Sequence, residues 1–187
     1  MASWWQQQHR DSQYGIHQFE QALRFTKQEG QALDVGCGAG GRFINRLLAS
    51  GFSVDGVDVS PKMIDLARQA HPSGNFYCED ICHWQTSKQY DFILAWDSLF
   101  HLPLDQQVPV LKKLTSILKS GGVLFYTFGD AEGDHYDRWR DDDFYYSSVG
   151  INKNIQVLLE NNMQPKHLEL DQFPEKHVMM IAIKSGG

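Results

Sequence analysis

A glycine-rich turn lies near the start of the chain, in the run Leu33-Asp34-Val35-Gly36-Cys37-Gly38-Ala39-Gly40. Glycine lets the main chain turn tightly and lets a ligand approach the backbone closely. The residues after the turn have helical spacing, and the start of a helix offers free N–H groups. The turn therefore predicts a ligand site. The spacing of Gly36, Gly38 and Gly41 also fits the dinucleotide fingerprint, so an NAD-type ligand is an alternative.

Three aspartates accompany this turn near the ends of expected strands. Asp34 lies two residues before the first glycine, where dinucleotide-binding turns usually have an apolar residue, and an acid there attracts a cationic ligand. Asp58 follows about twenty residues after the turn and is suited to accept hydrogen bonds from ribose hydroxyls with either ligand. Asp80 is suited to accept a hydrogen bond from an adenine amino group. The acids thus favour a nucleoside-bearing ligand with a positive charge.

The elements around these residues must position them. Five apolar segments with strand character alternate with segments of helical spacing, at Gln31–Val35, Phe52–Val59, Asn75–Cys78, Tyr90–Trp96 and Val123–Phe128. This alternation predicts crossover units and a mainly parallel sheet. Because parallel strands end at the same edge, we expect the acids and Trp96 to meet in one crevice at the carboxyl ends of the strands.

The rest of the chain departs from this alternation. Residues Ser12–Thr26 have an amphipathic helix pattern. The segment Gly129–Gly150 is polar, aromatic and acidic, and it is too long for a simple connection, which indicates a functional or mobile segment. After a last helix pattern, two strand-like runs, about His167–Phe173 and His177–Lys184, are joined by Pro174-Glu175. We expect these two runs to pair antiparallel at one edge of the sheet.

In these features the chain resembles the class I S-adenosylmethionine-dependent methyltransferases, as a small bacterial-type methyltransferase domain. The resemblance runs from about Gln31 to Lys184. The segments that carry it are Ala32–Gly40, Val57–Ser60, Glu79–Ile81, Tyr90–Ile93 with Leu99–Leu102, and Leu118–Leu124.

The resemblance implies an α/β, Rossmann-like doubly wound fold, with a mainly parallel seven-stranded sheet, an antiparallel C-terminal strand and helices on both faces. It implies a single methyltransferase domain over residues 1–187. Within this domain, residues 1–30 are expected to form an N-terminal helical lid and residues 129–150 a candidate insertion that covers the substrate. The antiparallel strand is foreign to dinucleotide dehydrogenases and would account for His177–Lys184.

The resemblance also implies S-adenosylmethionine as the cofactor and S-adenosylhomocysteine as its product. Asp34 and the backbone at Gly36 and Gly38 would face the methionine half, and Asp58 would bind the ribose. Trp96 would lie near the methyl-bearing sulfur. The remaining expected contacts complete the glycine turn or pack around the adenine: Cys37, Gly40, Val59, Met63, Asp80 and Ile81.

Methyl transfer needs little chemistry from the protein, because alignment of nucleophile, methyl group and sulfur supplies much of the rate. A general base helps when the acceptor must lose a proton. His101, after the fourth strand, is a candidate base or a structural histidine. Tyr145 and Tyr146 either pack on the substrate or anchor a loop, and His177, beside Glu175, has a cross-strand structural role as its alternative. The candidate catalytic residues are His101, Tyr145, Tyr146 and His177, with Asp97 and His135 as further candidates.

The composition of the chain argues against several classes of binding partner. The formal net charge is −6 and no clustered basic stripe is present, which argues against a nucleic-acid substrate. No apolar run approaches the roughly 20 residues of a membrane helix, and the N-terminus lacks the apolar core of a signal peptide, so we expect no membrane contact and a cytoplasmic location. The 3 cysteines indicate reduced thiols, with no metal site.

The acceptor class follows from how little of the chain is free to grip a macromolecule. The N-terminal helix and Gly129–Gly150 are the only segments expected to cover the site, so we expect a small-molecule acceptor. Trp4-Trp5 is a candidate contact patch, and the oligomeric state is not defined by the sequence. Two other functions compete: an NAD(P)-dependent oxidoreductase, and a non-catalytic binding protein that keeps the methyltransferase fold. Asp34 and Asp80 disfavour the first, and the complete set of cofactor acids disfavours the second.

Overall fold

A computed structural model describes residues 12–27, 29–139 and 142–186. Its main element is a seven-stranded sheet in the order β3-β2-β1-β4-β5-β9-β8. The strands are β1 (Gly30–Val35), β2 (Phe52–Asp58), β3 (Asn75–Cys78), β4 (Tyr90–Ala95), β5 (Leu118–Gly129), β8 (Met163–Glu169) and β9 (His177–Lys184). Strands β1 to β5 are parallel, and β9 is antiparallel to both β5 and β8. The predicted mainly parallel sheet with an antiparallel C-terminal strand is confirmed.

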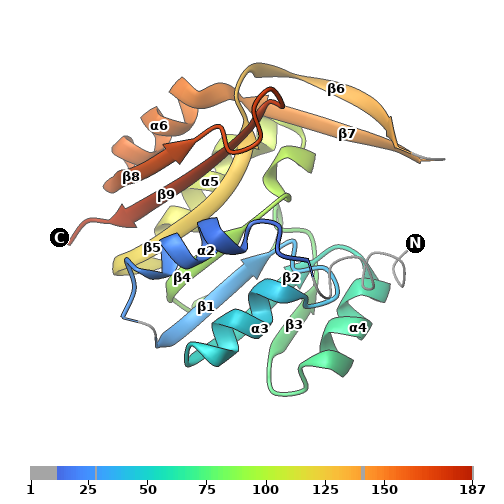
Figure 1. The fold of residues 1–187 in the computed structure, drawn as a ribbon, viewed down its shortest axis with the longest axis vertical. Coiled ribbons are helices and arrows are strands. Elements are labelled where there is room, and N and C mark those ends of the chain that lie inside the picture. Colours follow the sequence, from blue (N-terminus) through green and yellow to red (C-terminus); the bar gives the residue numbers. More distant parts are fainter. Residues whose placement is uncertain (1–11, 28, 140–141, 187) are drawn as a thin grey trace.

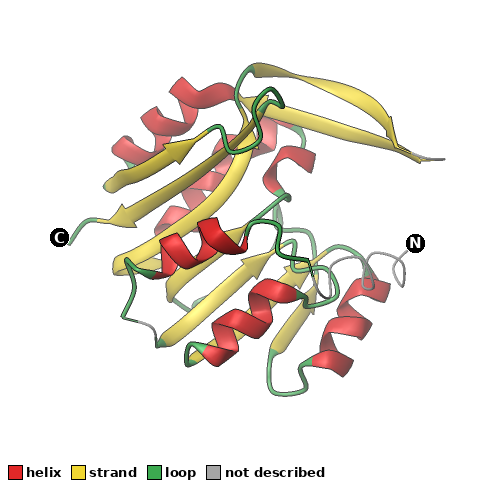
Figure 2. Ribbon diagram, in the orientation of Figure 1, coloured by secondary structure: helices red, strands yellow, loops and turns green. Residues whose placement is uncertain are grey.

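Helices cover both faces of this sheet (Figure 1). The helices are α2 (Ile16–Leu23), α3 (Arg42–Ala49), α4 (Pro61–Ala70), α5 (Leu104–Ser116) and α6 (Gly150–Glu160), with a short 3₁₀ helix, η1 (Leu99–His101). Helices α2, α3 and α4 share one apolar cluster with the sheet, and α5 and α6 share the other. Figure 2 shows these helices and the strands between them. In α3, for example, Phe43, Ile44 and Leu47 are buried, and this spacing keeps one side of a helix in the core.

The start of α4 shows how local sequence sets an element. Ser60 precedes the helix, and its hydroxyl accepts a hydrogen bond of 3.4 Å from the backbone nitrogen of Met63. Pro61 stands at the first helical position, where its missing N–H costs nothing. Strand β2 therefore ends and α4 begins within three residues of Asp58, which leaves that carboxylate at the edge of the sheet.

The segment expected as a long polar connection is a β-hairpin, made of β6 (Glu132–Trp139) and β7 (Asp142–Val149). Figure 1 shows it extending outward from the carboxyl edge of the main sheet. Its base is fixed to the body of the molecule, since the Ser147 hydroxyl donates a 2.6 Å hydrogen bond to the Leu102 carbonyl and the Gln107 side chain donates to the Ser147 carbonyl. Charged residues on both strands hide the apolar–polar alternation that predicts a strand.

Two element boundaries differ from the sequence predictions. Strand β8 begins at Met163 and ends at Glu169, so the predicted run His167–Phe173 began four residues too late, and residues 170–176 form the connection to β9. Strand β5 begins at Leu118, opposite Tyr90 and five residues before the predicted run Val123–Phe128.

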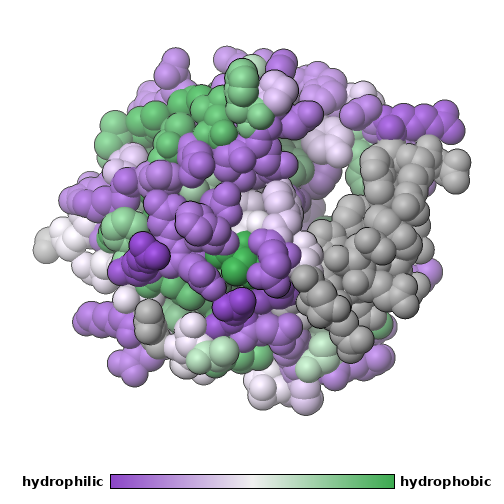
Figure 3. Space-filling model, in the orientation of Figure 1, coloured by the Kyte–Doolittle hydropathy of each residue, from purple (hydrophilic) through white to green (hydrophobic). Residues whose placement is uncertain are grey.

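The N-terminal segment has two parts. Residues 16–23 of the predicted lid form α2, whose Ile16, Phe19 and Leu23 are buried in the core. Residues 1–11, with the candidate contact patch Trp4-Trp5, lie outside the described residues. Among the residues described, no helix is both long and apolar enough to cross a membrane. Figure 3 shows a mainly hydrophilic face, with hydrophobic atoms gathered at the upper left, where α6 and β8 lie in Figure 1.

Candidate active site

Two neighbouring cavities open at the carboxyl ends of β1, β2 and β4. The smaller, of about 350 Å³, is lined by Val35, Gly36, Val57, Asp58, Val59, Glu79, Asp80, Ile81, Asp97, Ser98, Leu99, His101, Leu102 and Pro103. The larger, of about 690 Å³, is lined by Asp34, Gly36, Cys37, Gly38, Ala39, Gly40, Gly41, Arg42, Phe43, Asn45, Met63, Ala70, His71, Trp96, Asp97, Phe100, His101 and Tyr146. Because Gly36, Asp97 and His101 line both, the cavities adjoin at these residues.

The glycine turn separates the two cavities. Gly36 and Gly38 have positive φ angles of 75° and 54°, which L-residues rarely adopt. A Cβ on Gly36 would lie 2.5 Å from the Cβ of Ser98, so the turn packs directly against the end of β4. A Cβ on Gly38 would meet no heavy atom within 4 Å. The backbone at Gly38 is therefore open to a ligand in the larger cavity.

Asp58 fixes the shape of this turn. Its Oδ2 accepts a hydrogen bond of 2.9 Å from the Gly38 amide, and its Oδ1 accepts one of 2.8 Å from the Ser60 amide. A carboxylate has about four lone-pair positions, so each oxygen keeps capacity for a ligand hydroxyl. Asp58 is partly exposed in the smaller cavity, as a ribose-binding residue requires.

Asp34 is a buried carboxylate, 6% exposed, that lines the larger cavity. It accepts no hydrogen bond from the side chains and turns that the structure describes. Burial first, and then the negative charge of Asp58, raise the pKa of Asp34 to about 7, while the nearby Arg42 opposes this shift. Negative charge at this depth is costly, and a cation in the cavity would stabilise it.

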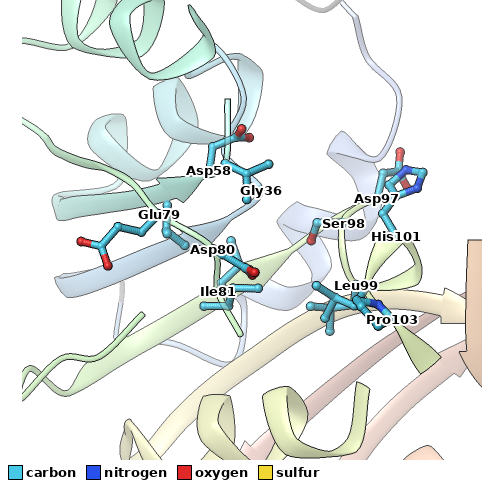
Figure 4. A pocket seen from close by; sticks show the side chains of 14 residues that line it. Gly36, Asp58, Glu79, Asp80, Ile81, Asp97, Ser98, Leu99, His101 and Pro103 are labelled. Carbon is cyan, nitrogen blue, oxygen red and sulfur yellow. The ribbon is translucent and has the colours of Figure 1, made fainter. Parts of the chain in front are cut away.

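The residues expected around the adenine divide between the cavities. Val59, Asp80 and Ile81 line the smaller cavity with Asp58, whereas Met63 lines the larger one. Figure 4 shows Asp58, Asp80 and Ile81 on one side of the smaller cavity, facing residues of the β4–α5 segment. The Asp80 carboxylate also accepts a 2.8 Å hydrogen bond from the Cys82 amide, and this bond is the main cause of its lowered pKa.

Two members of the glycine turn have mainly structural contacts. The Gly40 carbonyl accepts a 2.6 Å hydrogen bond from Nε2 of the buried His71, which ties the turn to the end of α4. Cys37 is buried, and burial raises the pKa of its thiol. Gly40 and Cys37 both line the larger cavity. One side of the turn therefore packs against the protein, and its other side faces the cavity.

Trp96 forms a wall between the larger cavity and the core. Its ring lies 5.2 Å from that of Phe125 and 5.7 Å from that of Phe43, and it meets Tyr14 edge-on at 5.5 Å. Its buried indole N–H has no partner among the described residues. Trp96 and the next residue, Asp97, thus line the same cavity, and its role near the methyl-bearing sulfur stays a prediction.

His101 and Tyr146 lie together, and Tyr145 does not join them. The His101 ring lines both cavities and lies 4.8 Å from the Tyr146 ring. Its Nδ1 donates a 2.9 Å hydrogen bond to the Tyr145 carbonyl, which leaves Nε2 as the acceptor in the neutral ring. The Tyr145 ring lines neither cavity and packs against Tyr136, because neighbouring residues of a strand point to opposite faces. His135 stacks on Tyr146 from the paired strand.

His177 bridges two carboxylates, which sequence reasoning did not foresee. Its Nδ1 lies 2.6 Å from Oδ1 of Asp171 and its Nε2 lies 3.0 Å from Oδ1 of Asp97. Burial lowers the pKa of His177, but the bonds to Asp171 and Asp97 outweigh burial and raise it to about 9. His177 lines neither cavity itself and contacts Asp97, which lines both, so its contacts are compatible with the predicted structural role.

Three further neighbours of the site were not predicted from the sequence: Arg42, Phe100 and Asp171. Arg42 lines the larger cavity, and its Nε donates a 2.6 Å hydrogen bond to the Tyr14 carbonyl. The Tyr14 hydroxyl lies 3.5 Å from Oδ1 of Asp97. Within the described ranges, no group of three or more His, Cys, Asp or Glu side chains is arranged to hold a metal ion.

Comparisons with known proteins agree with this arrangement. A family model described as a methyltransferase domain matches residues 32–122. Ubiquinone biosynthesis O-methyltransferase from Coxiella burnetii is 33% identical over 109 residues, which cover 56% of this chain and 45% of that enzyme. The chain spans less than half the length of the curated relatives it matches.

Solved structures share the whole fold. A S-adenosylmethionine-dependent methyltransferase from Clostridium acetobutylicum has a TM-score of 0.73 at 14% identity, over 94% of both chains. Magnesium protoporphyrin IX methyltransferase from Synechocystis PCC 6803, with bound S-adenosylmethionine, has a TM-score of 0.68 at 20% identity, over 92% of this chain and 79% of that one. At such identities the likeness establishes the fold.

Residues 32–122 match a methyltransferase domain, and the chain has the fold of S-adenosylmethionine-dependent methyltransferases.

Within this methyltransferase domain, the family match runs from β1 into β5 and includes the glycine turn, Asp58, Asp80 and Asp97. The β6–β7 hairpin, Asp171 and His177 lie beyond the matched residues. The strand-end acids and His101 therefore lie within the matched residues, while Tyr146 and His177 lie outside them.

Proposed function

We propose that this methyltransferase domain binds S-adenosylmethionine across the two cavities and transfers its methyl group to a small-molecule acceptor. One observation carries the proposal: the Asp34 carboxylate is buried, has no hydrogen-bond partner among the described residues, and faces a cavity lined by open glycine backbone. A buried charge without a partner is costly. A ligand with a cationic amino acid end removes this cost, and S-adenosylmethionine has such an end.

The residues fit the parts of this cofactor. Its methionine half would lie in the larger cavity, against Asp34 and the backbone of Gly36 and Gly38. Its ribose would lie at Asp58, and its adenine among Val59, Asp80 and Ile81 in the smaller cavity, with Cys37, Gly40 and Met63 on the other side of the turn and Trp96 at the junction. When bound, the cofactor supplies an electrophilic methyl group on a sulfonium.

The alternative of an NAD(P)-dependent oxidoreductase receives less support. Its nucleotide would also fit the Gly36, Gly38 and Gly41 spacing and Asp58. It offers no role to Asp34, because its phosphates would be repelled by a carboxylate at the turn. The insertion of the antiparallel β9 between β5 and β8 is likewise foreign to dinucleotide dehydrogenases.

The acceptor side of the proposal rests on the walls opposite the glycine turn. Phe100, His101 and Tyr146 bring aromatic surface to the larger cavity, and Tyr146 comes from the β6–β7 hairpin, which would then cover the acceptor. Aromatic walls around a cavity of this size suit a small organic molecule. The names of the Coxiella and Synechocystis proteins also point to small-molecule chemistry in those proteins.

Methyl transfer into a metabolite extract tests this function. The purified protein is incubated with methyl-labelled S-adenosylmethionine and a fractionated cell extract, and label is followed in the small-molecule, nucleic-acid and protein fractions. We expect label in the small-molecule fraction, and the labelled product identifies the acceptor. An Asp34→Ala variant serves as the control and should label weakly. Label confined to macromolecules would contradict the small-molecule acceptor, and no label in any fraction would contradict the enzyme.

A further inference from the structure

Three charged side chains are linked in series at the wall of the two cavities, and we refer to them as the Asp171–His177–Asp97 array. Asp171, in the connection before β9, has a side chain that is 1% exposed and lies 2.6 Å from Nδ1 of His177. His177 is 12% exposed, and its Nε2 lies 3.0 Å from Oδ1 of Asp97, at the end of β4. Asp97 is 33% exposed and lines both cavities. The array thus connects the buried Asp171 to Asp97 at the junction of the cavities.

Asp97 has an unusual backbone and one unused oxygen. Its φ angle is 51°, a conformation that costs a non-glycine residue energy and that recurs at functional sites. Its amide donates a 2.9 Å hydrogen bond to the Thr127 hydroxyl, which fixes this conformation. Oδ1 receives His177 and the more distant Tyr14 hydroxyl, while Oδ2 has no hydrogen-bond partner in the described part of the chain. One oxygen is therefore held in place and the other remains available.

The charges around His177 show that the Asp171–His177–Asp97 array is more than a simple ion pair. The charged groups that face the imidazole are Asp171 and Asp97, with Arg42 acting on Asp97 from α3. The bonds to both carboxylates raise the pKa of His177 to about 9 against the effect of burial, so both ring nitrogens donate at neutral pH. Asp171 balances the positive charge of the ring, which leaves Asp97 as net negative charge at the cavity wall.

We propose that Asp97 accepts the proton of a hydroxyl or amine acceptor during methyl transfer, and that Asp171 acts through His177 to position it. This inference rests on the proposed function. In this step the acceptor oxygen or nitrogen forms a bond to the methyl carbon, and the bond from that carbon to sulfur breaks with its electron pair on sulfur. The acceptor proton passes to Oδ2 of Asp97. An acceptor without an exchangeable proton, such as a tertiary amine or a carboxylate, would gain nothing from this arrangement.

Asp97 is the catalytic residue in this account, and His177 and Asp171 are positioning residues. An imidazolium holds Oδ1 through a charge-assisted hydrogen bond, which is stronger and more directional than a neutral one. Oδ2 is left without a partner among the described residues, at a residue that lines both cavities. His101 is the competing base, because its Nε2 is free to accept a proton at the same junction. Figure 4 shows both residues on the same side of the smaller cavity, across from Asp58 and Asp80.

Four variants separate these roles: Asp97→Asn, Asp171→Asn, His101→Gln and Glu169→Gln. The last is the matched control, since Glu169 pairs with His167 at 3.0 Å on the exposed surface of β8 and lines neither cavity. Each variant is measured for S-adenosylhomocysteine affinity by calorimetry, for His177 titration by imidazole NMR, and for methyl incorporation into the labelled product of the extract assay across pH.

We expect Asp97→Asn to lower incorporation by about 100-fold or more, the usual size of a general-base contribution, with S-adenosylhomocysteine affinity kept within about threefold. Asp171→Asn should lower the NMR midpoint of His177 from about 9 and shift the alkaline limb of the pH profile downward, with a smaller loss of rate. Glu169→Gln should match the wild type in all three measurements.

Full incorporation by Asp97→Asn, or a loss confined to His101→Gln, would overturn the inference and leave the proposed function standing. A His177 midpoint near 6.5 in the wild-type protein would also overturn it, whatever the activity. A labelled product that derives from an acceptor atom without an exchangeable proton would also overturn the inference. Absence of labelling by the wild-type protein would reject the proposed function, and this inference with it.

Discussion

The amide of Gly38 donates a hydrogen bond of 2.9 Å to Oδ2 of Asp58, and this bond joins the glycine turn after β1 to the end of β2. The residue proposed to bind ribose is thus also the residue that shapes the turn. Loss of the Asp58 carboxylate should therefore change two quantities, the affinity for the ligand and the stability of the ligand-free protein.

We expect Asp58→Ala to weaken S-adenosylhomocysteine binding by about 1 kcal/mol or more, the usual size of lost hydrogen bonds to a carboxylate. It should also lower the melting temperature of the ligand-free protein, because the amides of Gly38 and Ser60 lose their acceptor. Calorimetry and thermal unfolding check the two effects separately. Unchanged affinity would show that the ribose is held elsewhere.

A glycine pair tests whether the open space at Gly38 is the ligand site. Gly38 and Gly121 have φ angles of 54° and 77°, and a Cβ on either would meet nothing within 4 Å. Alanine at each position should therefore cost a similar 1–2 kcal/mol, roughly, of backbone strain. Only Gly38→Ala should abolish S-adenosylhomocysteine binding, since Gly121 lies in the first part of β5 and lines neither cavity. Equal affinity in the two variants would place the ligand away from the turn.

Local signals made the cofactor side of this site predictable. Asp34, Asp58 and Asp80 each lie within two residues of a strand end, and the apolar runs that mark those strands are short and clear. Since parallel strands end at one edge, placing the strands also placed the acids. Ser60 and Pro61 marked the start of α4 in the same local way.

The acceptor side of the site was not predictable in this way, because it depends on contacts that no local pattern encodes. Asp97 and His177 are 80 positions apart, and their meeting requires β9 to run antiparallel beside β5. Tyr145 and Tyr146 are neighbours in sequence, yet strand pairing in the charged β6–β7 hairpin decides which ring faces the cavity. A shift of one residue in that register would exchange them.

Cofactor binding should release a proton from Asp34. Its pKa of about 7 in the free protein means that about half of the molecules carry the proton at pH 7. A cationic ligand end beside it favours the carboxylate, so binding at pH 7 should release about half a proton per site. Calorimetric enthalpies in phosphate and in Tris should then differ by the corresponding ionisation heat. The same enthalpy in both buffers, or a difference that persists in Asp34→Asn, would contradict this assignment.

Stability should depend on pH through His177. Its pKa in the folded protein is about 9, above the ordinary value of 6.5, so protonated His177 stabilises the fold fully below about pH 6.5. This contribution is lost as the pH rises through about 9. Urea unfolding at pH 6.5 and 9.5 should show a larger loss of stability in the wild-type protein than in Asp171→Asn, where the pKa shift is smaller. Equal losses in the two proteins would show that His177 is not held between the two acids.

The central claim, a site for S-adenosylmethionine at the glycine turn, is tested most directly by titrating the wild-type protein with S-adenosylhomocysteine, NAD and NADP under the same calorimetric conditions. We predict saturable one-to-one binding of S-adenosylhomocysteine, with neither dinucleotide binding measurably. Binding of NAD or NADP in preference to S-adenosylhomocysteine would contradict the account.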